Sequence, residues 1–332
     1  MMYIVMLHVD YIGSKKKMWP HLSKVFDKLI SEDTVFGDLF SGTGVVSHHV
    51  SKRYNCDVVA NDVMYYAYIL TRAKLTHYSD VDIRRINKRV QIYNNTPPIH
   101  GYVTKHFAPP KRMYFTKQNA TKIDAIRSRI EQDKSTIPKK DYVYVLAALL
   151  AACDSVSNVT AVYGAYLKSF KKRAERVLTL QPIDPANVVT KSALVYNKNA
   201  SDMRAKTDVV YLDPPYNSRQ YSNNYHVMDT IARYRFDNLR GISGLPQITF
   251  KSKFSYKSQA RAALEQLVER LRRNTKVFVM SYSSDGILSK ASIVNILGKH
   301  GEVTVHAVKY PKFKSHQGVP DRFVTEYVFV SK

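Results

Sequence analysis

The chain has 332 residues, 45% of them hydrophobic, which is enough for a substantial core and excludes a disordered chain. Its 51 Lys and Arg outnumber 27 Asp and Glu, for a formal net charge of +24. A balance this basic favours a polyanionic partner, because each basic side chain that meets a phosphate releases condensed counterions. With 24 Tyr and 13 Phe available for stacking, nucleic acid is the expected partner. A basic protein that is merely soluble, or one that touches an anionic membrane, is the alternative.

The first ten residues, MMYIVMLHVD, lack the basic region and the cleavage site of a secretory signal. The longest apolar run, residues 142–153, is too short to cross a bilayer and predicts a core helix. Cys56 and Cys153 show neither CxxC nor Cys-His spacing, so no metal site or disulfide framework is expected. These features predict a soluble, cytoplasmic protein without a bound metal.

Residues 35–62 predict a βαβ unit: the strand VFGDLF, the turn SGTG, the helix VVSHHVSKRY and the strand CDVVAND. Gly42 and Gly44 in the turn allow a ligand to approach the backbone closely, although a plain tight turn would also use them. The turn lacks the Lys-Ser/Thr of a phosphate-binding loop and the third glycine of a dinucleotide site. Asp62 follows the glycines by about 20 residues, where a ribose-binding acid belongs. A nucleoside cofactor without a pyrophosphate fits this unit, and S-adenosylmethionine is the common one.

The rest of the chain predicts an α/β fold with a sheet that is split in sequence. Residues 66–195 are dominated by helical patterns, and strand patterns return at residues 208–213, 276–283, 302–310 and 322–331. A helix with one apolar face precedes the second of these strands, at residues 260–273. Alternating strands and helices predict a Rossmann-like, doubly wound sheet, with the C-terminal strands pairing antiparallel at its edge. The expected domains are 1–65 with 196–332, and a helical insert at 66–195.

The segment VVYLDPPYNSRQY, which begins at residue 209, brings a buried strand to an abrupt stop. Pro214 and Pro215 prevent further ladder pairing and helix formation, so the corner holds a carboxylate, a carbonyl and an aromatic ring in place. Adenine N6 is a poor nucleophile because its lone pair is delocalised into the ring. Asp213 and the carbonyl of Pro214 can each accept one N6 hydrogen, and Tyr216 can stack on an extruded base. The alternative is a chance motif with a turn-capping Asp.

Five segments in this order resemble the D12 class of DNA adenine-N6 methyltransferases, the α-ordered group that includes Dam: YIGSKKKMWPHL, DLFSGTG, ND, NASD and DPPYNSRQY. Within it the chain is most similar to the branch that holds FokI-type enzymes and those acting at CATG. The resemblance implies a Rossmann-like methyltransferase that moves the methyl group of S-adenosylmethionine to N6 of a flipped-out adenine. It further implies a short target motif in double-stranded DNA, CATG-like in one version, as in restriction-modification systems.

The resemblance also implies roles for individual residues. The methionine part of the cofactor would be flanked by Tyr11, Gly13 and Lys15. The cofactor loop would be formed by Asp38, Phe40, Ser41, Gly42 and Gly44. Asp62 would hold the ribose, and Asp202 with Met203 would border the cofactor adenine. The catalytic corner would comprise Asp213, Pro214, Pro215 and Tyr216.

Target recognition is expected in the helical insert and just after the corner. Arg can read guanine, and Asn or Gln can read adenine, whereas most other basic residues would meet phosphates or solvent. The candidate DNA-contacting residues are Arg112, Lys168, Lys171, Lys172, Arg173, Asn217, Arg219, Gln220 and Asn223.

Other functions stay open at this point. An RNA adenine-N6 methyltransferase shares the corner and the charge, and a DNA-binding protein on a decayed methyltransferase fold shares the charge alone. Cytosine-C5 transfer is excluded because it needs a Pro-Cys nucleophile, and the two cysteines follow Asn55 and Ala152. Cytosine-N4 transfer is possible, although that group more often has Ser at position 213. The sequence leaves open whether a cognate restriction endonuclease exists and whether the protein is a monomer or a weak dimer.

Overall fold

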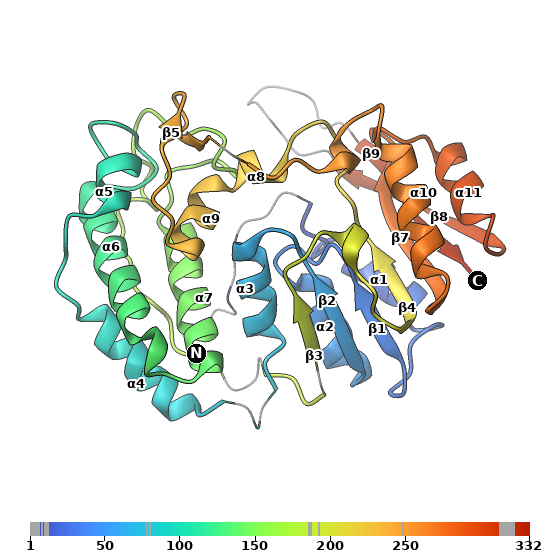
Figure 1. Ribbon diagram of the computed structural model, residues 1–332, viewed down its shortest axis with the longest axis horizontal. Helices are drawn as coiled ribbons and strands as arrows, with labels where there is room; N and C mark the ends of the chain where they lie inside the picture. The colour runs from blue at the N-terminus through green and yellow to red at the C-terminus, as the bar shows by residue number, and fades with distance from the viewer. Residues whose placement is uncertain are drawn as a thin grey trace.

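A computed structural model describes residues 7, 9, 13–77, 79, 81–184, 188–191, 193–247, 249–311 and 323–332. It consists of a sheet lobe and a helical lobe that lie side by side (Figure 1). The strands are β1 (Val35–Asp38), β2 (Asp57–Asn61), β3 (Ala193–Tyr196), β4 (Thr207–Leu212), β5 (Leu239–Arg240), β6 (Leu245–Pro246), β7 (Thr275–Ser283), β8 (Val303–Pro311) and β9 (Phe323–Ser331). The α-helices are α1 (Trp19–Phe26), α2 (Val45–Tyr54), α3 (Tyr65–Lys74), α4 (Ile83–Asn94), α5 (Tyr102–Phe107), α6 (Lys117–Gln132), α7 (Lys139–Ser155), α8 (Tyr221–Asn224), α9 (His226–Arg233), α10 (Ala260–Leu271) and α11 (Lys290–Leu297). Short 3-10 helices lie at η2 (Asp133–Ser135), η4 (Ala200–Asp202) and η5 (Lys253–Ser255).

Seven strands form the main sheet in the order β3-β2-β1-β4-β7-β9-β8. The first five of these run parallel, and β9 is antiparallel to both of its neighbours. In the sheet, β2 and β3 lie on one side of β1, and β4 lies on its other side. The carboxyl ends of β1 and β4 therefore flank a topological switch point, where open α/β sheets bind ligands.

The central strands are buried on both faces, as parallel strands covered by helices must be. Along β4, Val209 and Tyr211 pack on the side covered by α1 and α2, whereas Val210 and Leu212 pack on the side covered by α10 and α11. Successive side chains of a strand point to opposite faces, so this six-residue strand holds the two helical layers together.

The helical lobe has its own core, built mainly from α3, α6, α7 and α9. Its centre is α7, whose apolar run Tyr142–Leu150 is buried along its whole length, which confirms the core helix expected from the sequence. No helix in the described part of the chain is long and apolar enough to cross a membrane. The free thiols of Cys56 and Cys153 are both buried.

The sequence predicts most of this fold correctly. The βαβ unit, β4, α10 and the strands toward the carboxyl end lie where their patterns place them, and the last two strands pair antiparallel at the sheet edge. The C-terminal strand β9 is one place in from that edge, with β8 outermost. The strand β3 is not predicted from the sequence, because four residues flanked by polar segments carry too weak a strand signal. The sequence also does not predict that α9 joins the helical lobe, although Met228 and Ile231 on this helix belong to that core.

Asp124 on α6 holds the start of α5. Its carboxylate accepts hydrogen bonds from the backbone N–H groups of Gly101, Val103 and Thr104 at 2.8–3.0 Å, and from the Thr104 hydroxyl at 2.6 Å. The carboxylate thus satisfies the donors that a helix leaves free at its N-terminus. A β-carbon at Gly101 would lie 2.7 Å from the Asp124 carboxyl carbon, so this position must stay a glycine.

Replacing Asp124 by Ala should therefore lower the free energy of unfolding by about 2–4 kcal/mol, because several buried donors lose their acceptor. Urea denaturation of the variant against the parent protein measures this loss. Asp33→Ala is the matched control, because Asp33 is an exposed carboxylate outside any helix. Equal losses in both variants would contradict the capping role.

Candidate active site

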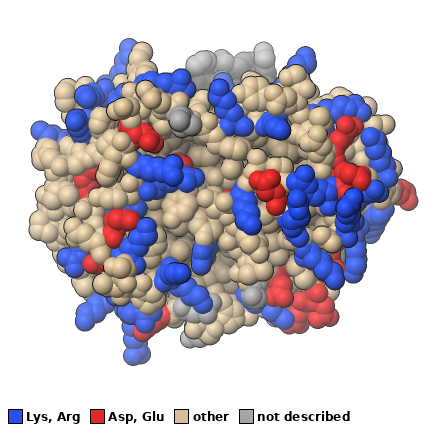
Figure 2. All heavy atoms as spheres, viewed as in Figure 1, with Lys and Arg blue, Asp and Glu red and all other residues tan. Residues whose placement is uncertain are grey.

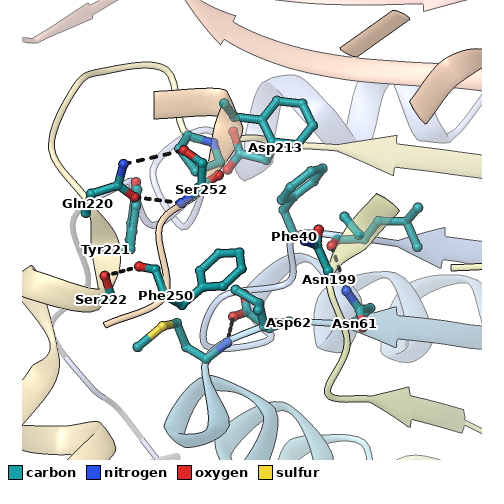
Figure 3. A pocket seen from close by; sticks show the side chains of 16 residues that line it. Phe40, Asn61, Asp62, Asn199, Asp213, Gln220, Tyr221, Ser222, Phe250 and Ser252 are labelled. Carbon is teal, nitrogen blue, oxygen red and sulfur yellow. Dashed lines mark hydrogen bonds between the residues drawn. The ribbon is translucent and has the colours of Figure 1, made fainter. Parts of the chain in front are cut away.

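A pocket opens at the switch point. Figure 3 shows Asp62 and Asp213 on opposite sides of it, with Phe40 between them. The lining residues come from the ends of β1, β2 and β4, from the segment after β3, and from residues 220–254: Leu39, Phe40, Asn61, Asp62, Val63, Met64, Asn199, Ala200, Asp213, Pro215, Gln220, Tyr221, Ser222, Phe250, Ser252 and Phe254. The pocket thus has aromatic walls and two carboxylates, a composition suited to a nucleoside.

The carboxylate of Asp62 is fixed at the end of β2. It accepts hydrogen bonds from the backbone N–H groups of Gly42 at 2.9 Å and of Met64 at 2.8 Å, one on each oxygen. A carboxylate has about four acceptor positions, so both oxygens keep capacity for hydroxyl groups of a ligand. Burial raises the pKa of Asp62 to about 7, although the two backbone hydrogen bonds oppose this shift.

Two glycines shape the loop between β1 and α2. Gly42 and Gly44 both have positive φ, at 52° and 75°, a conformation that other residues rarely adopt. At Gly44 a β-carbon would also lie 2.9 Å from the Cα atom of Thr71 on α3. The Thr71 hydroxyl donates to the carbonyl of Gly42 at 3.0 Å, which ties the loop to α3. The loop is therefore a rigid wall of the pocket.

Both oxygens of Asp213 are held by other side chains. The Lys15 ammonium donates to Oδ2 at 2.7 Å, and the Ser281 hydroxyl on β7 donates to Oδ1 at 2.8 Å. Behind Ser281, the hydroxyl of Tyr211 lies 2.7 Å from the Ser281 hydroxyl. Lys15 is buried and Asp213 is mostly buried, with 7% and 16% of their side chains exposed, so the ion pair is largely shielded from solvent. The orientation of the carboxylate is set before any ligand arrives.

Further acids surround this ion pair. Burial alone would lower the pKa of Lys15, but the carboxylates of Asp213 and Glu326 reverse this and raise it, so the ammonium stays charged. Glu326 on β9 is itself buried, and burial raises its pKa. Asp38 accepts a hydrogen bond from Ser47 at 2.6 Å, and burial, reinforced by the charges of Asp213 and Asp62, raises its pKa to about 7. The positive charge of Lys15 thus offsets part of the negative charge of Asp213 and Glu326.

Tyr216 ends the corner and packs on the neighbouring strand. Its ring lies 6.2 Å from that of Tyr282 in an edge-on arrangement, and its carbonyl accepts a hydrogen bond from the N–H of Ile287 at 2.9 Å. The ring is partly exposed but does not line the pocket described above. Stacking of Tyr216 on an extruded base stays a prediction.

The structure brings together many of the predicted cofactor residues. Phe40 and Asp62 line the pocket, Ser41, Gly42 and Gly44 shape its loop, and Asp38 is buried beneath it. Gly13 has φ of 85° and lies beside Tyr221. The Lys15 ammonium donates a hydrogen bond to Asp213 in the corner. Tyr11 lies outside the described residues.

Asp202 and Met203 do not line this pocket. Asp202 is exposed, and Met203 is buried in the core beneath the sheet. Asn199 and Ala200, from the same NASD segment, line the pocket instead. This segment therefore contributes Asn199 and Ala200 to the pocket, and not Asp202.

The nine predicted DNA-contacting residues differ in exposure and in their contacts within the protein. Lys168, Lys172 and Arg219 are exposed. Five others have hydrogen bonds within the protein: Arg112, Lys171, Arg173, Asn217 and Gln220. Asn223 is half-buried. Figure 2 shows Lys and Arg spread over both lobes on the face viewed, with Asp and Glu in smaller groups.

Several site residues are not predicted from the sequence. Tyr221, Phe250 and Phe254 line the pocket, and Ser281 and Glu326 surround the ion pair. Ser281 lies in the segment FVMSYSSDG, which is recognisable as a strand but does not single out its serine. Phe250 and Glu326 have no local signal, because their places depend on contacts across the fold.

Comparison with known proteins matches this geometry to a family. Residues 11–296 match the family model described as D12 class N6 adenine-specific DNA methyltransferase. The chain is 34% identical over 327 residues to the type II methyltransferase M.CviAII of Paramecium bursaria Chlorella virus 1, with 98% of each chain covered. It is also 34% identical to M.NlaIII of Neisseria lactamica, covering 92% of this chain and 93% of that protein. M.FokI of Planomicrobium okeanokoites is 34% identical over 96% of this chain, which spans 52% of that longer protein.

The raised pKa values of Asp38 and Asp62 predict how stability depends on pH. Both carboxyl groups have a pKa of about 7 in the folded protein, against 3.8 for an unperturbed Asp. Between these pH values the folded state binds more protons than the unfolded chain, so these two groups lower stability as pH rises. Asp38→Asn should therefore raise stability by roughly 2–4 kcal/mol at about pH 8 and much less at about pH 5.

Differential scanning calorimetry of the ligand-free protein at both pH values measures this difference. Asp57→Asn, at an exposed position, should leave the pH dependence unchanged. An Asp38→Asn variant with the pH dependence of the parent protein would show that Asp38 is ionised throughout.

Proposed function

Since the chain belongs to the D12 class of N6 adenine-specific DNA methyltransferases, it is an S-adenosylmethionine-dependent DNA adenine methyltransferase, and we propose that it modifies one short motif in double-stranded DNA. The named relatives are type II methyltransferases, which supports a role in restriction-modification. The observation that carries the proposal is the oriented Asp213 carboxylate facing Asp62 across one aromatic pocket. A CATG-like motif is the target we propose to test first.

The lining of the pocket suits the cofactor. S-adenosylmethionine supplies the activated methyl group when it is bound. Asp62 would accept the ribose hydroxyls, because both of its oxygens keep acceptor capacity beside the loop. Phe40, with Phe254 packed edge-on at 5.2 Å, would contact the apolar parts of the cofactor. Asn199 and Ala200 would border its adenine.

Asp213 would prepare the adenine amino group for attack. Its carboxylate and the carbonyl of Pro214 would each accept one N6 hydrogen, which draws the lone pair out of conjugation with the ring. Methyl transfer would form a bond between N6 and the methyl carbon as the bond from that carbon to the sulfur of the cofactor breaks, and N6 would release one proton to water, so the methylated base is neutral. Such preorganised acceptors lower the barrier without having to reorient during the reaction.

Lys15 and Ser281 would act as positioning residues. Each occupies one oxygen of Asp213, so the carboxylate cannot rotate freely, and each oxygen keeps a second lone pair for substrate. Lys15 also compensates part of the negative charge of Asp213 and Glu326. The ion pair would keep the acceptor aimed and ionised.

The substrate would be bound by the exposed basic residues of both lobes. Lys168, Lys172 and Arg219 would contact phosphates or bases, whereas Gln220 pairs with the backbone of Ser252 and would shape the pocket. We propose that the protein acts inside the cell as a monomer or weak dimer, with a restriction endonuclease of the same specificity as its partner.

Expression in a methylation-free bacterial strain tests the function directly. Plasmid DNA should acquire N6-methyladenine at one short motif, which single-molecule sequencing identifies together with the motif itself. DNA from cells that express Asp213→Ala is the control and should be unmodified. Soluble parent protein that leaves every DNA adenine unmodified would contradict the proposal and favour an RNA substrate.

Asp213→Ala should abolish methyl transfer and leave DNA affinity within about tenfold, because the corner acts in the chemical step. Single-turnover methyl transfer and filter binding measure the two quantities separately. A variant with parental activity would refute the assigned role of Asp213.

Lys15→Met should slow single-turnover methyl transfer by about 100-fold or more, because it leaves a buried carboxylate without its counter-charge. Lys16→Met is the matched control, because Lys16 is exposed beside it and should be neutral. Thermal unfolding of both variants distinguishes a chemical defect from loss of the fold. Parental rates in a folded Lys15→Met variant would contradict the positioning role.

A further inference from the structure

A buried tyrosine stands behind the serine that holds Asp213. Tyr211 on β4 and Ser281 on β7 are both buried, and their hydroxyl oxygens are 2.7 Å apart. The Ser281 hydroxyl in turn lies 2.8 Å from Oδ1 of Asp213. Within the described part of the chain, Ser281 is the single hydrogen-bond partner of the Tyr211 hydroxyl. This hydroxyl pair, Tyr211 with Ser281, therefore ends on the carboxylate of the corner.

The pairing of the two strands brings these groups together. Tyr211 is opposite Val279 in the parallel register of β4 and β7. Asp213 and Ser281, each two residues further on, therefore also lie opposite each other. Side chains two residues apart point to the same face, so all four lie on the side of the sheet that α1 and α2 cover. The ring of Phe26 on α1 meets the Tyr211 ring edge-on at 5.8 Å and holds it in this layer.

The direction of the two hydrogen bonds follows from the chemistry of the groups. An ionised carboxylate only accepts, so the one hydrogen of the Ser281 hydroxyl points to Asp213. Ser281 then offers only lone pairs to Tyr211, and the tyrosine has to donate. Burial and the charge of Asp213 raise the pKa of Tyr211 well above its usual value, so the phenol keeps its proton. The order of donation is therefore from Tyr211 to Ser281 and from Ser281 to Asp213.

The hydroxyl of Tyr211 affects Ser281 in two ways. A hydroxyl that accepts a hydrogen bond is polarised and forms a stronger bond with its own acceptor. The donated hydrogen also occupies one side of the Ser281 oxygen, which keeps the serine hydrogen aimed at Oδ1 of Asp213. A phenylalanine at position 211 would fill the same space and keep the ring contact with Phe26. The tyrosine hydroxyl thus contributes through Ser281 and not through apolar packing.

We propose that Tyr211 is a positioning residue for methyl transfer, which acts through Ser281 to hold the carboxylate of Asp213 in its productive orientation; this inference rests on the proposed function. An acceptor that is oriented in advance lowers the barrier only while its orientation is kept. Lys15 holds the other oxygen of Asp213, so the hydroxyl pair is the second of two restraints on the carboxylate. Tyr211 does not line the pocket, so its loss should affect the chemical step and not the binding of ligands.

A double-mutant cycle tests this role. Single-turnover methyl transfer is measured on duplex DNA that carries the methylated motif, at saturating DNA and cofactor, for Tyr211→Phe, Ser281→Ala and the double variant. Tyr211→Phe should slow the reaction by about fivefold and Ser281→Ala by about 20-fold, because each loses a hydrogen bond that orients the carboxylate. The double variant should be no slower than Ser281→Ala, because Tyr211 acts only through the serine. Dissociation constants for DNA and for S-adenosylmethionine should stay within about twofold of the parental values.

Tyr93→Phe is the matched control. The Tyr93 ring is also buried, and its hydroxyl donates to a carboxylate, that of Asp133 at 3.0 Å, but both residues belong to the helical lobe. This variant loses the same kind of hydrogen bond and should keep the parental rate. Thermal unfolding of all variants establishes that the rates refer to folded protein.

Each other outcome overturns the role of Tyr211. A parental rate for folded Tyr211→Phe would show that its hydroxyl serves the core alone, and an equal loss in Tyr93→Phe would assign the effect to stability. A double variant slowed by both factors, about 100-fold, would show that Tyr211 acts independently of Ser281. If the parent protein methylates no duplex, the proposed function fails and this role fails with it. An active parent protein with an insensitive Tyr211→Phe variant overturns the role of Tyr211 alone.

Discussion

The buried ion pair between Lys15 and Asp213 is the interaction on which the site depends. It joins residues that are 198 positions apart and closes the segment before α1 over the carboxyl end of β4. A buried pair of charges contributes little net stability, because desolvation opposes the attraction, but loss of one partner leaves an uncompensated charge. The ion pair matters because it orients the carboxylate of Asp213. Lys15 binds its Oδ2 atom and Ser281 binds its Oδ1 atom. Pro214 and Pro215 restrain the backbone that follows.

The sheet supplies the second half of this arrangement. Strand β7 pairs in parallel with β4, with Tyr211 opposite Val279, and continues past the end of β4 to Ser283. Ser281 therefore stands beside the corner, and the Tyr211 hydroxyl meets Ser281 from the neighbouring strand. Strand β9 pairs with β7 and brings Glu326 opposite Ser283. Three adjacent strands thus place an acid, a serine and a second acid around one ammonium group.

The segment between β4 and α10 connects the pocket to the helical lobe. It begins at the corner, enters the helical core at Tyr225, turns at the hairpin formed by β5 and β6 and returns to the pocket at Phe250 and Phe254. Buried residues from the helical lobe, Tyr114 and His226 among them, hold the hairpin. One continuous piece of backbone therefore lines the pocket and packs into the helical lobe.

The sequence by itself determines the features whose cause is local. The glycines before α2, the acid after β2 and the Asp-Pro-Pro-Tyr corner can be read directly, because turn geometry and proline restraints act within a few residues. The strand and helix patterns likewise predict the α/β class and the antiparallel C-terminal pair. Only the tertiary structure decides that Lys15 meets Asp213, that Ser281 rather than its neighbours holds the second oxygen, and that α9 joins the helical lobe. These outcomes follow from packing and from the pairing of distant strands, which leave no periodic or compositional mark in the chain.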